Sequence, residues 1–179
     1  PRGARPPRRV GTRGVSRGAD FLRRHDERGG HRRRAVRTSV LVDTGVFFAH
    51  HDTDAERHEV AVDAFDELLD GTYGQPYTND YVLDETVTLT RKRTGSFEAA
   101  DTVARRILGE GSFPQVVEML HVEPDDVRAS LETFRRYHDH DLSFTDATVV
   151  AQCESRGIDA VLSFDADFDG LVDRVEPGE

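Results

Sequence analysis

The sequence has very little cysteine. Its 179 residues include one cysteine, Cys153, which excludes an internal disulfide framework and a cysteine-based zinc site. Cys153 follows the apolar run 149–151, so we expect an inert thiol on a buried helix face. No apolar run approaches the ~20 residues of a membrane-spanning helix, and the N-terminal stretch has no apolar segment of the kind found in secretory signals. We therefore expect a cytoplasmic protein.

Positive charge is also scarce over most of the chain. Residues 38–179 contain 11 basic and 31 acidic residues, and Lys92 is the only lysine. Surfaces dominated by Asp and Glu are typical of halophilic proteins, because salt at ~1 M shortens the screening length to ~3 Å. An ordinary acidic cytosolic protein is the alternative. In either case the number of carboxylates says little, and only their positions are informative.

The first 37 residues differ from the rest. Residues 1–37 contain 13 arginines and 3 acidic residues, and they are rich in Gly and Pro. They offer little material for a core, so we expect disorder. One interpretation is a basic arm that contacts nucleic-acid phosphates. We favour the other, a mis-assigned upstream segment, because the stretch 36–40 would make a natural beginning for the domain at 38–179.

Residues 38–179 alternate between short apolar strands and amphipathic helices. Strands are expected at 39–43, 75–78, 115–122, 158–164 and 172–175. Helices are expected at 54–69, from Asn79 or Asp80 to about 95, at 96–109 and 124–137, and from a Ser143–Asp146 capping box to about 155. This alternation predicts an α/β fold with three layers, α/β/α, and a central, mostly parallel sheet.

Acidic residues lie at the edges between apolar strands and the turns or helices beside them. Asp43 ends the run 40–42, Asp165 follows the run 161–164, and Asp146 lies where an apolar-periodic helix begins. The carboxyl ends of parallel strands meet in one crevice, the usual place for chemistry in an open α/β sheet. Converging anions repel one another, so a hard divalent cation is expected among them.

The segments that carry these carboxylates resemble the acidic motifs of PIN-domain nucleases. The matching segments are Val40-Leu41-Val42-Asp43-Thr44, Leu83-Asp84-Glu85-Thr86-Val87, Leu142-Ser143-Phe144-Thr145-Asp146-Ala147 and Leu162-Ser163-Phe164-Asp165-Ala166-Asp167-Phe168. Their order and the size of the domain also resemble the VapC toxins of toxin–antitoxin pairs. The resemblance covers roughly residues 38–175, and it implies a metal-dependent ribonuclease.

The resemblance also implies which residues form the site. The carboxylates that would hold one or two Mg²⁺ or Mn²⁺ ions and act in catalysis are those of Asp43, Glu85, Asp146 and Asp165. Asp167 would be an outer or water-mediated ligand, and it competes with Asp165 for the inner place, as Asp84 competes with Glu85. Without a metal role, these residues would be turn, helix-surface or capping residues.

Substrate contacts are harder to assign from the sequence. The hydroxyls of Thr44 and Thr145 would orient carboxylates or water, or serve only as caps. Arg91, Lys92 and Arg93 follow Glu85 along the same helix and are candidates for RNA backbone contacts, although basic residues also suit a helix C-terminus. The pair His50–His51 is expected to be solvated near the groove. No paired aromatics indicate a base-stacking platform.

Two other motifs are excluded by their context. The spacing of Asp165, Asp167 and Asp169 with Gly170 and Glu176 fits an EF-hand calcium loop. That loop requires a helix on each side, but a β-rich run precedes it and only three residues follow Glu176. The same acidic pair also resembles the haloacid-dehalogenase motif, which opens its fold, whereas this one nearly ends the chain.

The partners follow from the resemblance alone. VapC-type toxins imply an RNA substrate, a homodimer and a small VapB-like antitoxin that occupies the groove, and the apolar positions of 54–109 are our choice for the contact surface. A housekeeping RNA-processing nuclease is one alternative. A catalytically silent RNA- or protein-binding module is another, but a silent module need not retain four converging anions.

Overall fold

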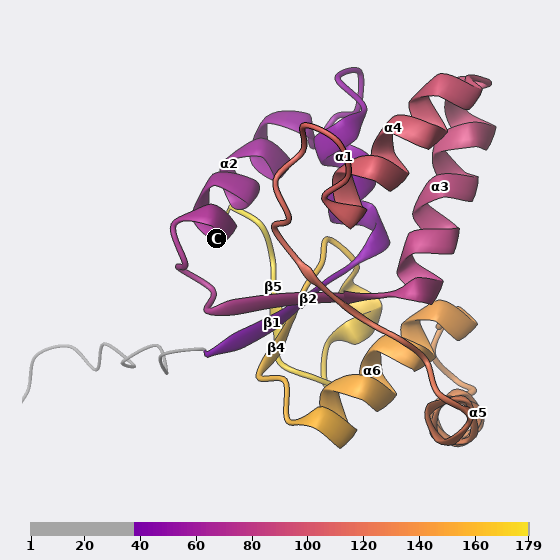
Figure 1. The fold of residues 1–179 in the computed structure, drawn as a ribbon. Helices are drawn as coiled ribbons and strands as arrows, with labels where there is room; N and C mark the ends of the chain where they lie inside the picture. Colours follow the sequence, from indigo (N-terminus) through magenta and orange to yellow (C-terminus); the bar gives the residue numbers. More distant parts are fainter. Residues whose placement is uncertain (1–37, 179) are drawn as a thin grey trace, which may run out of the picture. The chain divides into compact units, whose positions relative to one another are not determined.

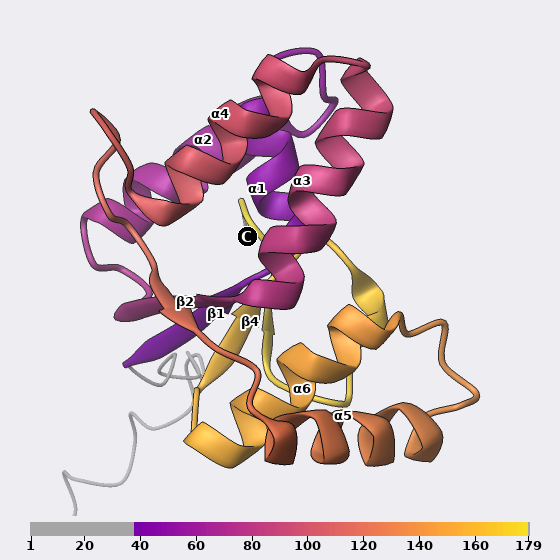
Figure 2. The ribbon, with the colours of Figure 1, turned by 45° about the vertical axis from the view of Figure 1, so that its right-hand side comes forward.

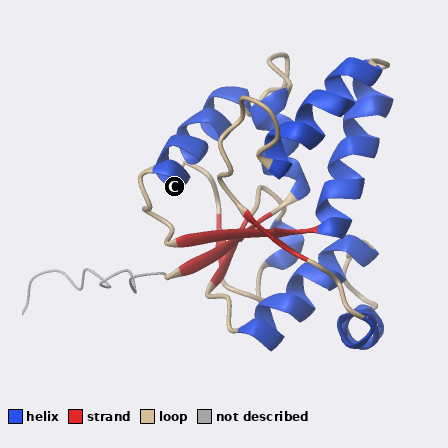
Figure 3. Cartoon of the chain, viewed as in Figure 1, coloured by secondary structure: helices blue, strands red, loops and turns tan. Residues whose placement is uncertain are grey.

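The computed structural model describes residues 38–178, so the predictions for residues 1–37 fall outside the described residues. The elements alternate between strand and helix along the chain (Figures 1 and 3). They are β1 (Ser39–Val42), α1 (Thr44–His51), α2 (His58–Leu69), β2 (Gln75–Asn79), α3 (Asp80–Thr94), α4 (Phe97–Leu108), β3 (Glu118–Leu120), α5 (Pro124–Arg136), α6 (Phe144–Arg156), β4 (Ala160–Leu162), the 3₁₀ helix η1 (Ala166–Phe168) and β5 (Arg174–Val175).

The five strands form one parallel sheet in the order β3-β2-β1-β4-β5. In β1, Val40 and Leu41 lie opposite Ala160 and Val161 of β4. These four side chains are almost completely buried. Continuous apolar strands such as these are expected where helices cover both faces of a parallel sheet.

Helices cover the sheet on two sides. Helices α1 to α4 lie on one face, and α5 and α6 pack together on the other (Figures 1 and 2). The predicted three-layer α/β/α fold with a parallel sheet is therefore confirmed. None of the helices within residues 38–178 combines the length and the apolar character that crossing a membrane would require.

Helix ends follow the predicted capping residues. The Asn79 side chain accepts a hydrogen bond from the Val82 backbone N–H at 2.8 Å, and Ser96 caps α4 in the same way. Ser143 and Asp146 form the predicted capping box at the start of α6. Gly157 ends α6 with a left-handed φ of 67°, which a residue with a side chain adopts at a cost.

Several elements differ from the sequence-based prediction. Residues 44–51 form a helix, α1, that was not predicted, and α2 begins at His58 rather than at residue 54. Helix α1 is short and buries residues on several of its faces, including Val46, Phe47 and Ala49, so it lacks the polar stripe that reveals an amphipathic helix. Strand β3 is only 118–120 because it lies at the edge of the sheet, where pairing on one side is absent.

A network of polar side chains, buried at its centre and exposed at one end, joins β2, α5 and α6. The Asn79 amide donates to Gln152 Oε1 at 3.0 Å and to Thr148 Oγ1 at 3.1 Å. Gln152, which is fully buried, in turn donates toward Asp126 at 3.4 Å, and Arg156 donates to the same carboxylate at 3.0 Å. We call these five residues the α5–α6 network.

Cysteine chemistry agrees with the expectation of an inert thiol. Cys153 is buried on α6, and burial raises the pKa of its thiol to about 12. A thiol with so high a pKa is almost entirely protonated near neutral pH, so it is a poor nucleophile.

Candidate active site

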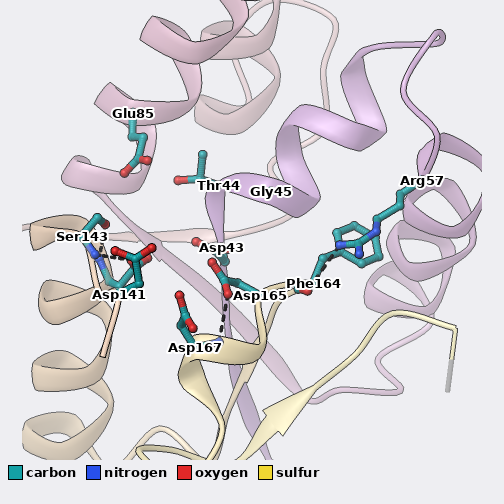
Figure 4. A pocket seen from close by; sticks show the side chains of 11 residues that line it. Asp43, Thr44, Gly45, Arg57, Glu85, Asp141, Ser143, Phe164, Asp165 and Asp167 are labelled. Carbon is teal, nitrogen blue, oxygen red and sulfur yellow. Dashed lines mark hydrogen bonds between the residues drawn. The ribbon is translucent and has the colours of Figure 1, made fainter. Parts of the chain in front are cut away.

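A pocket of about 550 Å³ lies where β1 and β4 end (Figure 4). Six carboxylates and one guanidinium line it. The lining residues are Asp43, Thr44, Gly45, Arg57, Glu85, Asp141, Ser143, Asp146, Phe164, Asp165 and Asp167. The structure therefore brings all four predicted acidic residues, and Asp167 with them, into one cavity.

Asp43 is the most deeply buried of these carboxylates. It follows β1 as the N-cap residue of α1, and only 6 % of its surface is exposed. The Ser163 hydroxyl donates to its Oδ2 atom at 2.7 Å. Burial, together with a smaller effect of the nearby charge of Asp146, raises the pKa of Asp43 to about 7 against the opposing effect of the Ser163 bond. The fold thus holds an acid that titrates near neutral pH.

Asp146 is both a capping residue of α6 and part of the pocket lining. Its Oδ2 atom accepts a hydrogen bond from the Ser143 backbone N–H at 2.7 Å, which fixes the side chain at the start of α6. Burial raises its pKa, and the charges of Glu85 and Asp165 add to that rise. The capping bonds therefore orient a carboxylate that still faces other anions in the pocket.

The remaining predicted carboxylates come from two other elements. Glu85 reaches the pocket from α3, whereas its neighbour Asp84 is exposed and does not line it. Asp165 caps η1 by accepting from the Asp167 backbone N–H at 2.9 Å. Asp165 and Asp167 both line the cavity, so the sequence-based ranking between them stays a prediction. The helix η1 also occupies the segment that the EF-hand pattern assigns to a loop.

The donor set suits a hard divalent cation, because Mg²⁺ and Mn²⁺ prefer oxygen ligands. Thr44 adds a second observation, because its Oγ1 atom is buried at the pocket and makes no hydrogen bond with any of residues 38–178. However, no three His, Cys, Asp or Glu side chains among residues 38–178 are arranged closely enough to hold an ion as they stand. The residues fit a metal chemically, and ligation stays a prediction.

Four predicted substrate residues do not line the pocket: Thr145, Arg91, Lys92 and Arg93. Arg91 donates to the Gly95 carbonyl at the end of α3, which is the structural role expected at a helix C-terminus. The three basic residues are exposed on the last turn of α3. Their contact with RNA stays a prediction.

The prediction of solvated histidines is wrong for His50. Its ring stacks on Phe65 with the centroids 3.9 Å apart, and Arg106 lies within hydrogen-bond distance at 3.2 Å. Burial, followed by the positive charge of Arg106, lowers the pKa of His50 to about 4. This imidazole is therefore neutral near pH 7 and belongs to the packing between α1, α2 and α4.

Several pocket residues were not identified from the sequence. Arg57 and Asp141 both come from loops, and nothing local distinguishes them from other charged loop residues. An aromatic cluster was also missed. The Phe144 ring meets Tyr81 at 5.7 Å and Phe134 at 6.2 Å between centroids, both edge to face. These rings come from three separate helices, so no local pattern in the sequence could indicate that they pack together.

Comparison with known proteins gives a consistent picture. The family model described as "PIN domain" matches residues 40–172. The chain is 34 % identical to the 23S rRNA-specific endonuclease VapC20 of Mycobacterium tuberculosis over 129 aligned residues. The alignment covers 72 % of this chain and 91 % of that protein. The chain is 25 % identical over 131 residues to a VapC ribonuclease of Archaeoglobus fulgidus, which spans 73 % and 79 %.

Solved structures share the fold. The crystal structure of M. tuberculosis VapC20, titled a sarcin–ricin loop cleaving toxin, aligns with a TM-score of 0.61 and 30 % identity over 72 % of this chain and 92 % of that one. The structure of VapBC2 from Rickettsia felis bound to a fragment of promoter DNA aligns with a TM-score of 0.57 over 76 % and 97 %, at 8 % identity. The second match bears on the fold alone.

Proposed function

This chain belongs to the PIN domain family, and from that membership we propose that it is a metal-dependent endoribonuclease, the toxin of a toxin–antitoxin pair. The observation that carries the proposal is the convergence of Asp43, Glu85, Asp146 and Asp165, distant in sequence, on one pocket. Such anions raise one another's pKa, and folded proteins seldom keep that repulsion without a use for it.

The ion, Mg²⁺ or Mn²⁺, would be held by Asp43, Glu85, Asp146 and Asp165, with Asp167 in an outer position. When bound, it would polarise a water molecule and neutralise charge that develops on the phosphate. Selective use of either ion is a matter for measurement. We expect products with a 5′-phosphate and a 3′-hydroxyl.

Hydrogen bonds from the protein orient the carboxylates of the pocket. The Ser163 hydroxyl fixes one oxygen of Asp43, and the Ser143 backbone fixes one oxygen of Asp146. Both carboxylates line the pocket. The Thr44 hydroxyl, buried without a partner, is available to donate to a water molecule or to a phosphate oxygen. Preorganised groups of this kind need little rearrangement when substrate binds.

We propose a VapB-like antitoxin and a second copy of the chain as partners. Exposed apolar side chains support a contact surface on α2 and α4: Leu69 is 59 % exposed, Phe97 64 % and Leu108 39 %. These residues lie within 54–109, the segment expected to make such contacts. We also propose a cytoplasmic setting at high salt, supported only by the acidic composition.

The test is cleavage of RNA by the full chain at high salt, with Mg²⁺, Mn²⁺ or EDTA. The substrates are a pool of total RNA and a sarcin–ricin stem–loop, since VapC20 is named for that target. We expect cleavage with either ion and none with EDTA. Glu85→Gln should reduce the rate about 10³-fold, the scale expected for a lost group that stabilises charge in the transition state.

The matched control is Asp84→Asn, one residue away and outside the pocket, which should cleave at the parental rate. Equal activity of both variants would remove the site assignment. A parent that binds RNA but never cuts it would favour the silent binding module. Selective trimming of precursor rRNA without general toxicity would favour the housekeeping nuclease.

A further inference from the structure

Among residues 38–178, Arg57 is the only basic side chain that lines the pocket. It lies at the start of α2, and its guanidinium carbon is 4.8 Å from the centroid of the Phe164 ring. Its Nη1 atom donates to the Phe164 carbonyl at 3.3 Å. In Figure 4, Arg57 and Phe164 stand at one edge of the pocket, away from Glu85, with Asp43 and Asp165 between them.

The Arg57 guanidinium is unusual because it makes no ion pair within the described part of the chain although carboxylates line the same pocket. Six carboxylates line the same pocket, yet Arg57 makes no ion pair with any residue of 38–178. The ring and carbonyl of Phe164 hold it instead, using one of its five N–H donors. The remaining donors form a planar fork, which matches the oxygens of a phosphate better than an ammonium group does.

We propose that Arg57 binds an RNA backbone phosphate next to the scissile one, and that Phe164 is the residue that positions it. The inference rests on the proposed function, because it takes RNA as the substrate. An acidic pocket repels a polyanion, and the bound ion would neutralise the phosphate at the carboxylates. A neighbouring phosphate would then lie toward the opposite edge, where Arg57 offers the only positive charge that residues 38–178 contribute to the lining.

Such a contact is made in the ground state as well as in the transition state, so it lowers KM and leaves kcat unchanged. Arg57→Ala should raise KM for RNA about tenfold, the lower end for a hydrogen bond to a charged group, with kcat within about twofold. It should also flatten the plot of log KM against log salt by about 0.7, the value for one phosphate contact on a single strand.

Two variants separate this role from a general effect of charge. Arg128→Ala removes the same charge from α5, where Arg128 pairs with Asp125 outside the pocket, and should change neither KM nor the salt slope. Arg57→Lys keeps the charge but loses the fork, so it should keep the parental slope with an intermediate KM.

Phe164 gives an independent readout. Phe164→Leu removes the ring under the guanidinium and should raise KM severalfold, whereas Phe164→Tyr keeps the ring and should behave like the parent. In the Arg57→Ala background, Phe164→Leu should add nothing, because the two residues act as a unit. Circular dichroism and thermal midpoints identify any variant that fails to fold.

The outcomes are distinct. If the parent cleaves RNA and Arg57→Ala keeps its KM and salt slope, the inference is overturned and the ribonuclease proposal stands. If kcat falls while KM does not change, Arg57 acts in the transition state and the inference is again overturned. If the parent neither binds nor cleaves RNA, both proposals are overturned together.

Discussion

Two carboxylates in this domain, the buried Asp43 and the partly buried Asp126, differ in how their charge is compensated. Asp126, in the α5–α6 network, receives hydrogen bonds from the Glu123 backbone, Gln152 and Arg156. Burial raises its pKa, but these bonds outweigh burial and hold the pKa below its usual value. Asp43 in the pocket accepts from the Ser163 hydroxyl but makes no ion pair with a basic side chain of residues 38–178, and burial raises its pKa to about 7.

This difference distinguishes acidic residues that stabilise the fold from acidic residues that are retained to bind a ligand. A carboxylate whose hydrogen bonds and ion pairs are complete stabilises the fold, because its charged form is favoured in place. A buried carboxylate without a cation destabilises the fold, and it is retained where a ligand supplies the missing charge. In a chain with 34 acidic residues, the hydrogen bonds and ion pairs of each carboxylate are more informative about function than the number of carboxylates.

The largest effect is expected from replacing the two contrasted carboxylates by amides. Asp43→Asn should reduce RNA cleavage about 10³-fold. In EDTA at pH 8 the same change should raise the free energy of unfolding by about 1–3 kcal/mol, because it removes a charge that the fold does not compensate. Asp126→Asn should lower that free energy by about 1 kcal/mol and leave cleavage intact. Urea unfolding and cleavage rates measure both, and a loss of stability in Asp43→Asn would refute the contrast.

The second effect concerns the α5–α6 network alone. Gln152 is fully buried and bonds to both Asn79 and Asp126. Gln152→Ala should lower the free energy of unfolding by about 2–4 kcal/mol, since it leaves a cavity and removes the partners of buried polar groups. Gln115→Ala is the matched control on an exposed position and should cost less than about 0.5 kcal/mol. A cost below about 1 kcal/mol for Gln152→Ala would mean that the network is not structural.

The sequence predicted the pocket better than it predicted the network. Asp43 directly follows β1 and Asp165 lies three residues beyond β4, and parallel strands end at one edge, so local patterns were enough to bring them together. Ser143 and Asp146 were found by the spacing of a capping box. Gln152 carries no such signal, because its partners come from β2 and α5 and only the packed helices bring them into range.

Loops and short helices show the same limit. Arg57 lies in a loop whose position depends on where α1 and α2 pack, and α1 itself has no polar stripe to reveal it. The aromatic cluster of Tyr81, Phe134 and Phe144 joins three helices. Local sequence thus defines strand ends and caps, whereas contacts between elements require the tertiary structure.

The third effect is the pH dependence of stability, which should have opposite signs for Asp43 in the pocket and Asp126 in the α5–α6 network. The pKa of Asp43 is raised, so in EDTA its contribution to stability is present at low pH and is lost as pH rises through about 7. An ion must displace that proton, so Mn²⁺ affinity should fall about tenfold from pH 8 to pH 6. Titration calorimetry should show proton release on binding, and Asp43→Asn should release clearly less than the parent. Affinity that is constant from pH 6 to 8 would contradict this account of the pocket.

The smallest effect tests the compensation of Asp126 directly. Arg156 donates to Asp126 at 3.0 Å, and that carboxylate is 13 % exposed, whereas Arg128 pairs with Asp125, which is 88 % exposed. Arg156→Ala should therefore cost about 1 kcal/mol and Arg128→Ala almost nothing, because water screens the second pair. Because the pKa of Asp126 is lowered in the folded protein, its charge stabilises the fold at pH values above the pKa of the unfolded chain. This stabilisation is lost as the pH falls through the pKa of the folded state. The cost of Arg156→Ala should thus vanish in acid, where Asp126 is neutral, and a cost independent of pH would show that Arg156 acts through its packing instead of its charge.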